Sequence, residues 1–347
     1  MGELEAAPQF APLLQAAYGA LSAQILWSAV TLGIPERLAQ EGPTTADELA
    51  PKLGIETSIL ERILRALGSL GVCEETNESR FRLTQMGEYL RPGHPDSIES
   101  RVLLNGDVFF QLWGELIETI RTGEGGSRRA FGMSFEEYLA QQPRIGALFD
   151  RTMASEAPTR HRPALEAYDF GQFKTVVDIG GGNGALIVEI LSAHPQLSGI
   201  VFDLPRTAAS AQKTIEARGL IDRCQFIGGD ACEVVPGGGD AYIFANFFVS
   251  WDDGRAALPL RNTRRVIAET GRLLLLEWVM PTPDEPPMSF RSWETVSRDM
   301  LILSISGSKA RVRSLAAFRD LLSASGFEMS AVIPTRGSVT IIEAKPI

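Results

Sequence analysis

Hydrophobic and polar positions follow two different periods along the chain. In the first third, apolar residues recur at helical spacing over residues 9–32 and 57–71, with a capped helix predicted between them from Thr44 to Gly54. A short hairpin is predicted at residues 72–83. From Thr175 onward, short apolar runs that end near Asp or Gly alternate with helical segments. This alternation predicts an α/β domain whose sheet is mostly parallel, with an antiparallel strand at its C-terminal end.

The same pattern divides the chain into three predicted parts. Three helices followed by a hairpin make residues 1–95 similar to a winged helix. Residues 96–170 are predicted to form a helical bridge, and residues 171–347 the α/β domain. A chain of 347 residues is long enough for two domains, each with its own core.

A glycine-rich turn joins the first predicted strand of the α/β domain to its first helix. Asp178 lies near the end of the strand, Gly180 and Gly182 lie in the turn, and the helix begins at Ala185. Glycine backbone and a helix N-terminus offer donors to an anionic group, and a carboxylate beside them can hold an ammonium group. The turn therefore suits an amino acid as well as a phosphate. Its spacing also fits a dinucleotide fingerprint or a tight turn without a ligand.

Two further predicted strands are followed by acidic residues. Asp203 ends one strand beside Leu204, and Asp230 follows the next strand beside Ala231. In parallel sheets, an acid after the second strand is where a ribose diol is held, and ligands bind at the carboxyl ends of the strands. Acids at three neighbouring strand ends therefore predict a nucleoside site. A dinucleotide-binding enzyme has less need of the first two acids and hardly any of the third, so this pattern favours a nucleoside ligand over a dinucleotide.

These motifs, together with Trp251-Asp252-Asp253, resemble the S-adenosylmethionine-dependent O-methyltransferases of the plant caffeate and bacterial polyketide-tailoring type. The resemblance covers nearly the whole chain. It implies a Rossmann-like methyltransferase domain, S-adenosylmethionine as the cofactor, and dimerisation through the winged-helix-like domain. The predicted cofactor-binding residues are Asp178, Gly180, Gly182, Asp203, Leu204, Asp230, Ala231 and Ala245. Ala245 stands where the family has a lysine next to the cofactor.

Charge opposes a different interpretation of the winged-helix pattern, a ligand-binding regulator that reads DNA. Residues 1–95 contain seven Lys and Arg and twelve Asp and Glu (7 − 12 = −5), and the whole chain carries −10. A nucleic-acid reader needs a basic surface, so we expect no nucleic-acid partner. The family resemblance implies a different role for this segment, the interface of a homodimer. No apolar run approaches the roughly 18 residues that cross a bilayer, so no membrane partner is expected.

Cysteine and histidine usage predicts no metal site. Cys73, Cys224 and Cys232 lack metal or redox spacing, and the three histidines are far apart in the sequence. The odd number of cysteines favours reduced thiols, and the acidic start Met1–Glu5 lacks a signal-peptide pattern. Both observations predict a cytoplasmic protein.

The family resemblance implies that the helical bridge walls a pocket for a small-molecule acceptor. Phe110, Trp113 and Met153 are the predicted contacts from the bridge. Asn246 and Met300 are the predicted contacts from the α/β domain. For each apolar residue of this set, ordinary core packing is the competing interpretation.

One position departs from the family. The family uses a histidine two residues before the tryptophan of the Trp-Asp-Asp motif as its general base, oriented by two glutamates. This sequence has Val249 at the histidine position, which cannot take a proton, and Ala310 at the second glutamate. The first glutamate matches Glu277, which is predicted to be catalytic or to orient the substrate. A phenol with a pKa of about 10 needs a base at neutral pH, and general-base catalysis contributes roughly 10²–10⁴-fold.

Four explanations are compatible with the missing base. The acceptor is a hydroxyl acidic enough to be ionised already, a nitrogen with a free lone pair, or an activated carbon whose proton leaves later to Glu277 or water. In the fourth, methyl transfer is lost and the cofactor serves a tailoring reaction such as hydroxylation or cyclisation. The sequence predicts a homodimeric methyltransferase that acts on an aromatic or polyketide-like secondary metabolite. A non-methylating tailoring enzyme and a ligand-binding regulator are the alternatives.

Overall fold

The computed structural model describes residues 9–282 and 289–347 of the chain. Contacts divide it into two compact units, Met1–Gly114 with Gln142–Ser155, and Glu115–Gln141 with Glu156–Ile347. The helical segment predicted over residues 96–170 contributes to both units. The acidic start Met1–Glu5 lies outside the described residues.

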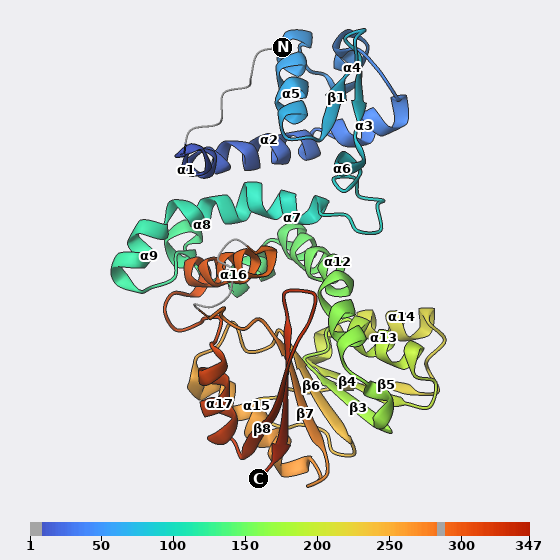
Figure 1. Ribbon diagram of the computed structural model, residues 1–347, viewed down its shortest axis with the longest axis vertical. Helices are drawn as coiled ribbons and strands as arrows, with labels where there is room; N and C mark the ends of the chain where they lie inside the picture. Colours follow the sequence, from blue (N-terminus) through green and yellow to red (C-terminus); the bar gives the residue numbers. More distant parts are fainter. Residues whose placement is uncertain (1–8, 283–288) are drawn as a thin grey trace. The chain divides into compact units, whose positions relative to one another are not determined.

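The first unit is helical with one small hairpin (Figure 1). Its elements are α1 (Ala11–Ala17), α2 (Gly19–Thr31), α3 (Ile34–Glu41), α4 (Ala46–Leu53), α5 (Thr57–Ser69), β1 (Cys73–Glu75), β2 (Phe81–Leu83), α6 (Gln85–Glu88), α7 (Glu99–Leu104), a π-helical turn (Asn105–Phe109), α8 (Phe110–Gly114) and the first half of α12 (Pro143–Ala167). The hairpin and the helices on either side of Gly54 agree with the prediction.

Local sequence explains most of these boundaries. Thr45 caps α4 in a complete capping box with Glu48, and Gly54 ends the helix in the left-handed conformation. The helix predicted over residues 9–32 is instead two helices that meet at Tyr18. Gly33 is in the left-handed conformation, and a further helix, α3, begins directly after it.

The second unit contains the sheet. Its helices are α9 (Leu116–Thr122), α10 (Ser127–Phe131), α11 (Phe135–Gln141), the second half of α12, α13 (Ala185–Ala193), α14 (Ala208–Ala217), α15 (Asp253–Val266), α16 (Phe290–Ser306) and α17 (Leu315–Ser323), with 3₁₀ turns at Phe170–Gln172 and Pro205–Thr207. Its strands are β3 (Thr175–Ile179), β4 (Ser198–Asp203), β5 (Cys224–Gly228), β6 (Ala241–Ala245), β7 (Arg272–Glu277), β8 (Phe327–Pro334) and β9 (Thr340–Pro346).

The sheet order is β5-β4-β3-β6-β7-β9-β8. Strands β5 to β7 are parallel, and β9 inserts antiparallel between β7 and β8. The mostly parallel sheet with a C-terminal antiparallel strand is therefore confirmed. After β3 the chain adds β4 and β5 on one side and then crosses to place β6 on the other side of β3. The strand order therefore reverses between β3 and β6, and in open α/β sheets ligands bind at such a point.

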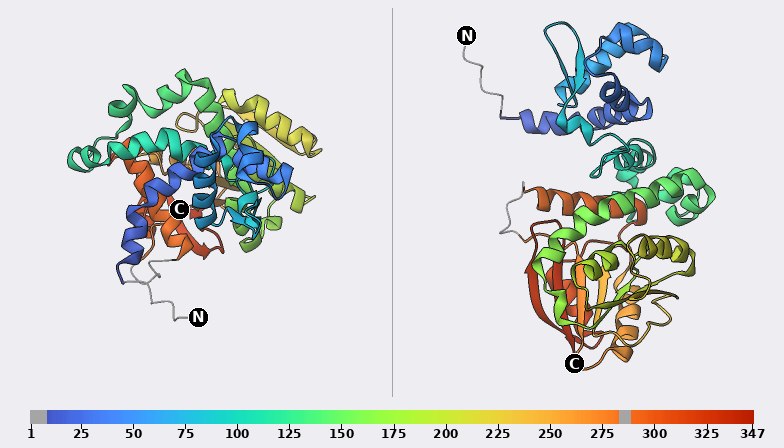
Figure 2. Two further views of the ribbon diagram at one scale, coloured as in Figure 1. Left: turned by 90° about the horizontal axis from the view of Figure 1, so that it is seen from above. Right: turned by 90° about the vertical axis from the view of Figure 1, so that its right-hand side faces the viewer.

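Alternate residues of each central strand enter two separate hydrophobic cores. Val176 of β3 packs with α13 and α14 on one face, whereas Val177 packs with α15 and α17 on the other. Helices accordingly cover both faces of the sheet (Figures 1 and 2). Burial on both faces explains why these strands are continuous apolar runs instead of alternating ones.

Within the described ranges 9–282 and 289–347, no single helix has the length and apolar character to cross a membrane. Helices α1 and α2, bent by 49° where they meet, pass that test only as a pair and only on length and composition.

Candidate functional site

A cavity of about 290 Å³ lies at the carboxyl ends of β3, β4, β5 and β6. Each of these strands contributes residues directly at or after its end, which is why residues far apart in sequence meet here. Its lining residues are Gly180, Phe202, Asp203, Leu204, Gly229, Asp230, Ala231, Ala245, Asn246, Phe247, Trp251 and Arg255. The predicted cofactor residues are all in this lining except Asp178 and Gly182.

The carboxylate of Asp203 organises the edge of the cavity near β4. Its Oδ2 accepts a hydrogen bond from Gly182 N at 2.8 Å, and its Oδ1 accepts one from Leu204 N at 2.6 Å. Gly182 therefore contributes its backbone to the site through Asp203. Each carboxylate oxygen can accept a second hydrogen bond, so Asp203 is held in place and still able to accept from a ligand hydroxyl.

Asp178 lies beneath the glycine turn and is almost completely buried. Its Oδ2 has no hydrogen-bond partner among the described residues. Burial, and then the neighbouring charge of Asp203, raises the pKa of Asp178 to about 7. A buried carboxylate without a partner is costly, and a cationic group beside it lowers that cost.

The glycine at position 180 is required by a protein contact. Gly180 has a φ of 72°, and a Cβ there would lie 2.4 Å from the ring of Phe247. Gly182 also has a left-handed φ, 56°, but an added Cβ would meet nothing within 4 Å. The open space at Gly182 agrees with our expectation that the turn leaves its backbone accessible, whereas Gly180 makes room for the aromatic side chain.

A tight turn after β6 forms the other side of the cavity. Asn246 adopts a left-handed φ of 51°, which Asn tolerates better than most residues. Glu277, at the end of β7, fixes the turn, because its Oε1 accepts hydrogen bonds from Phe247 N at 2.6 Å and Phe248 N at 3.1 Å. The carboxyl group thus positions the backbone that lines the cavity.

A buried arginine holds the same turn from the opposite side. Arg313 donates to the carbonyl oxygens of Phe248 at 2.6 Å and Trp251 at 2.8 Å, and its Nε donates to Asp253 at 3.0 Å. Its side chain is 1% exposed. No sequence motif indicates this role, because Arg313 lies 60 residues from Asp253.

Val249 lies in the stretch held by Glu277 and Arg313, where it is partly buried against the hydrophobic core. Burial raises the pKa of Glu277 to about 8, although the N–H groups of Phe248 and Phe247 and the charge of Arg313 oppose the rise. Glu277 is therefore largely protonated at neutral pH. Whether it also reaches an acceptor stays a prediction.

The predicted acceptor contacts fall in both compact units. Phe110 and Trp113 are on α8 and Met153 is on the first half of α12, all in the first unit. Asn246 and Met300, the latter on α16, are in the second unit. Their grouping around one acceptor stays a prediction.

The sequence analysis missed His161. This residue lies on α12, which continues through two prolines to Ala167. The Nε2 of His161 lies 3.4 Å from Nδ2 of Asn246. Burial, together with the charge of Arg160, lowers the pKa of His161 to about 3, so its imidazole is neutral at neutral pH.

Comparison with known proteins identifies the family. The O-methyltransferase domain model matches residues 113–328, and the O-methyltransferase dimerisation domain model matches residues 14–92. The chain is 37% identical over 342 residues to phenazine O-methyltransferase PhzM of Lysobacter antibioticus, covering 99% of this chain and 98% of that protein.

Solved structures agree with this match. The crystal structure of LaPhzM has a TM-score of 0.88 and 36% identity, covering 98% of this chain and 100% of that one. An O-methyltransferase from neocarzinostatin biosynthesis, solved with S-adenosyl-L-homocysteine and 1,4-dihydroxy-2-naphthoic acid, has a TM-score of 0.77 and 28% identity, with 94% and 96% coverage. The chain therefore belongs to the O-methyltransferase family, carries both its catalytic and its dimerisation domain, and is a methyltransferase of secondary metabolism.

Proposed function

We propose that this protein transfers a methyl group from S-adenosylmethionine to an acidic hydroxyl of a small aromatic metabolite. The observation that carries the proposal is the single cavity that joins Asp203, Asp230 and the glycine turn at the carboxyl ends of parallel strands. S-Adenosylmethionine would supply an electrophilic methyl group on a sulfonium centre.

The cavity fits this cofactor in three respects. Asp203 can accept from the ribose hydroxyls while its two backbone hydrogen bonds keep it in place. Asp230 and Ala231 line the cavity next to Asp203, where the adenine would lie. Asp178 offers a buried carboxylate oxygen without a partner, which suits the ammonium group of the amino-acid part. A solved relative holds S-adenosyl-L-homocysteine, which supports the same ligand here.

The missing histidine determines the acceptor class. Val249 cannot take a proton, and Glu277 is tied to two backbone N–H groups. Catalysis then depends on placing an already ionised oxygen in line with the methyl group, and positioning alone contributes on the order of 7–11 kcal/mol. A hydroxyl whose pKa is lowered by a conjugated electron-withdrawing group meets this requirement. The neocarzinostatin relative was solved with 1,4-dihydroxy-2-naphthoic acid, which supports a hydroxylated aromatic ring as the acceptor class here.

Dimerisation is the second part of the proposal. In and next to α1 and α2, Phe10 is 61%, Leu13 76%, Tyr18 58% and Leu21 56% exposed in the single chain. Neighbouring exposed apolar side chains of this size usually mark an interaction surface. The match to the family's dimerisation domain, which begins at residue 14 and includes part of α1 and all of α2, supports a homodimer. Sedimentation equilibrium of the purified chain tests this assignment directly.

A labelling assay tests the enzymatic proposal. The protein is incubated with methyl-labelled S-adenosylmethionine and a panel of hydroxylated aromatic compounds whose hydroxyl pKa values range from about 6 to about 10. We expect label in the acidic members and little in simple phenols. Label on nitrogen or carbon would replace the proposed acceptor atom. Tight cofactor binding without label in any product would favour a non-methylating tailoring enzyme, and no cofactor binding would refute the proposal altogether.

A further inference from the structure

Asn246 and His161 form a polar pair at one end of the cofactor cavity. Asn246 lines that cavity, and His161 lines a second cavity of about 110 Å³ between α12, α13 and α14. The two side chains meet at 3.4 Å through Nδ2 of Asn246 and Nε2 of His161. The pair therefore lies between the two cavities and faces both.

Each member of the pair has one polar atom that the protein leaves without a partner. Oδ1 of Asn246 and Nδ1 of His161 are buried, and neither makes a hydrogen bond among the described residues. Nearly all buried polar atoms in proteins have a partner, so two orphans in one contact point to a ligand that completes them.

The contact also determines which atoms of the pair donate and which accept a hydrogen bond. When Nδ2 of Asn246 donates to Nε2 of His161, the proton of the neutral imidazole is on Nδ1, which becomes a donor. Oδ1 of Asn246 is then an acceptor. The opposite amide orientation exchanges the two roles and again leaves one donor and one acceptor. A zwitterionic amino-acid group, with a carboxylate beside an ammonium group, complements this arrangement.

Sheet order indicates which end of the cofactor lies here. Asp230 follows β5 and Asp203 ends β4, so the adenosine part occupies the β5–β4 side. Asn246 follows β6, three strand spacings from β5, or about 14 Å at roughly 4.8 Å per spacing. An elongated molecule whose base is at β5 therefore brings its other end to β3 and β6. Asp178, with its own unpartnered oxygen, lies on β3 beside that end.

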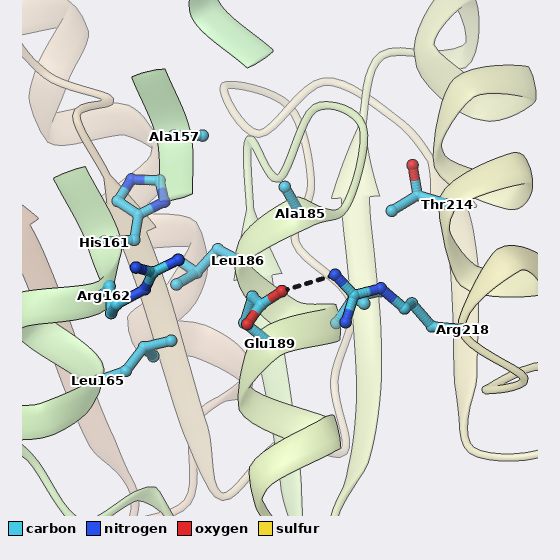
Figure 3. Close-up of a pocket in the computed structure, with 10 residues that line it drawn as sticks. Ala157, His161, Arg162, Leu165, Ala185, Leu186, Glu189, Thr214 and Arg218 are labelled. Carbon is cyan, nitrogen blue, oxygen red and sulfur yellow. Dashed lines mark hydrogen bonds and ion pairs between the residues drawn. The ribbon is translucent and has the colours of Figure 1, made fainter. Parts of the chain in front are cut away.

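The surroundings of His161 agree with this placement. In Figure 3 its imidazole lies across from Ala185, the first residue of α13 after the glycine turn. The positive end of the α13 helix dipole lies on the same side and favours a carboxylate there. Leu165 and Leu186 supply apolar walls.

We propose that His161 and Asn246 bind the amino-acid end of S-adenosylmethionine, with the imidazole N–H directed at its carboxylate. The inference rests on the proposed function and adds to it the residues that select the amino-acid part of the cofactor. It also gives Asn246 a role in cofactor binding instead of the acceptor contact expected from the sequence.

Comparing two ligands distinguishes a loss of contacts to the amino-acid end from a general disruption of the cofactor site. S-Adenosylhomocysteine contains the amino-acid end, whereas 5′-methylthioadenosine lacks it and retains the adenosine. Affinity for each is measured by calorimetry on wild type, on His161→Phe and on Asn246→Gly, which tolerates the left-handed φ of 51° but removes the acceptor for the ligand's ammonium group. His194→Phe is the matched control, because His194 lies at the other end of α13.

We expect both variants to bind S-adenosylhomocysteine about tenfold or more weakly, since a lost hydrogen bond to a charged group costs roughly 1.5–3 kcal/mol. Affinity for 5′-methylthioadenosine should stay within about twofold, and the control should match wild type for both ligands. Equal losses for the two ligands, or unchanged affinity for S-adenosylhomocysteine, would overturn the inference. Failure of wild type to bind either ligand would instead refute the proposed function.

Discussion

The carboxyl group of Glu277 should control the stability of the turn that lines the cofactor cavity. Its Oε1 accepts hydrogen bonds from Phe247 N at 2.6 Å and Phe248 N at 3.1 Å, and the side chain is almost completely buried. Two substitutions separate the role of this carboxyl group as a hydrogen-bond acceptor from the effect of its ionisation. Glu277→Leu removes the acceptor, whereas Glu277→Gln keeps a carbonyl oxygen in the same place and cannot ionise.

The size of the effect follows from the two backbone donors. Each buried N–H that loses its acceptor costs about 1–3 kcal/mol, so Glu277→Leu should lose on the order of 2–6 kcal/mol of unfolding free energy. That is a large share of the roughly 5–15 kcal/mol typical of a folded domain. At about 2–4 °C per kcal/mol, the unfolding midpoint should fall on the order of 10 °C.

The Gln variant isolates the cost of ionisation. The pKa of Glu277 is raised from 4.5 to about 8, chiefly by burial. The native state therefore favours the protonated group, so stability is greatest below the unfolded-state pKa and falls as pH rises towards the native pKa. The loss accrues between 4.5 and about 8, at up to roughly 1.4 kcal/mol per pH unit. Gln avoids this loss.

Thermal unfolding of the three proteins between about pH 5 and pH 9 provides the assay. The midpoint of Glu277→Gln minus that of wild type should grow up to about pH 8 and then level off. Asp178, whose pKa is also raised, contributes equally to both proteins and cancels in the difference. A difference that does not change with pH, or a Leu variant as stable as wild type, would refute this account of Glu277.

Three further predictions follow from the same turn and cavity. Arg313→Met should lower the unfolding midpoint and weaken S-adenosylhomocysteine binding, because two hydrogen bonds to the turn and one to Asp253 are lost. Arg311→Met, which removes an ion pair whose arginine side chain is 54% exposed, should change both little. Gly180→Ala should lower the stability of the fold more than Gly182→Ala. Both substitutions strain a left-handed φ, but only the first also places a Cβ 2.4 Å from an aromatic ring. Equal unfolding midpoints of the two variants would contradict this prediction. Val249→His should raise kcat on weakly acidic phenols by up to roughly 10²-fold and leave acidic acceptors nearly unchanged; equal gains on both classes, measured across a pH–rate profile, would argue against a missing base.

The strands and helices of the second unit could be predicted from the sequence for a clear physical reason. Strands buried on both faces are continuous apolar runs, and α13 is bounded by Gly184 and His194 as the local signals indicate. Acids near strand ends also predicted the cavity, because parallel strands bring their carboxyl ends to one edge of the sheet. Helix lengths were less accessible. α12 passes through Pro158 and Pro163, which normally favour a helix boundary, so the local sequence does not indicate the single long helix that places His161 beside Asn246.

The sequence by itself determined the order of strands and helices and the residues at the strand ends, since these depend on local period and on turn chemistry. Tertiary structure decided which of those residues act on one another. Glu277 and Arg313 hold the turn after β6 from distant parts of the chain, and the His161–Asn246 contact joins residues 85 apart. Such contacts depend on packing and burial, for which no short stretch of sequence contains the information.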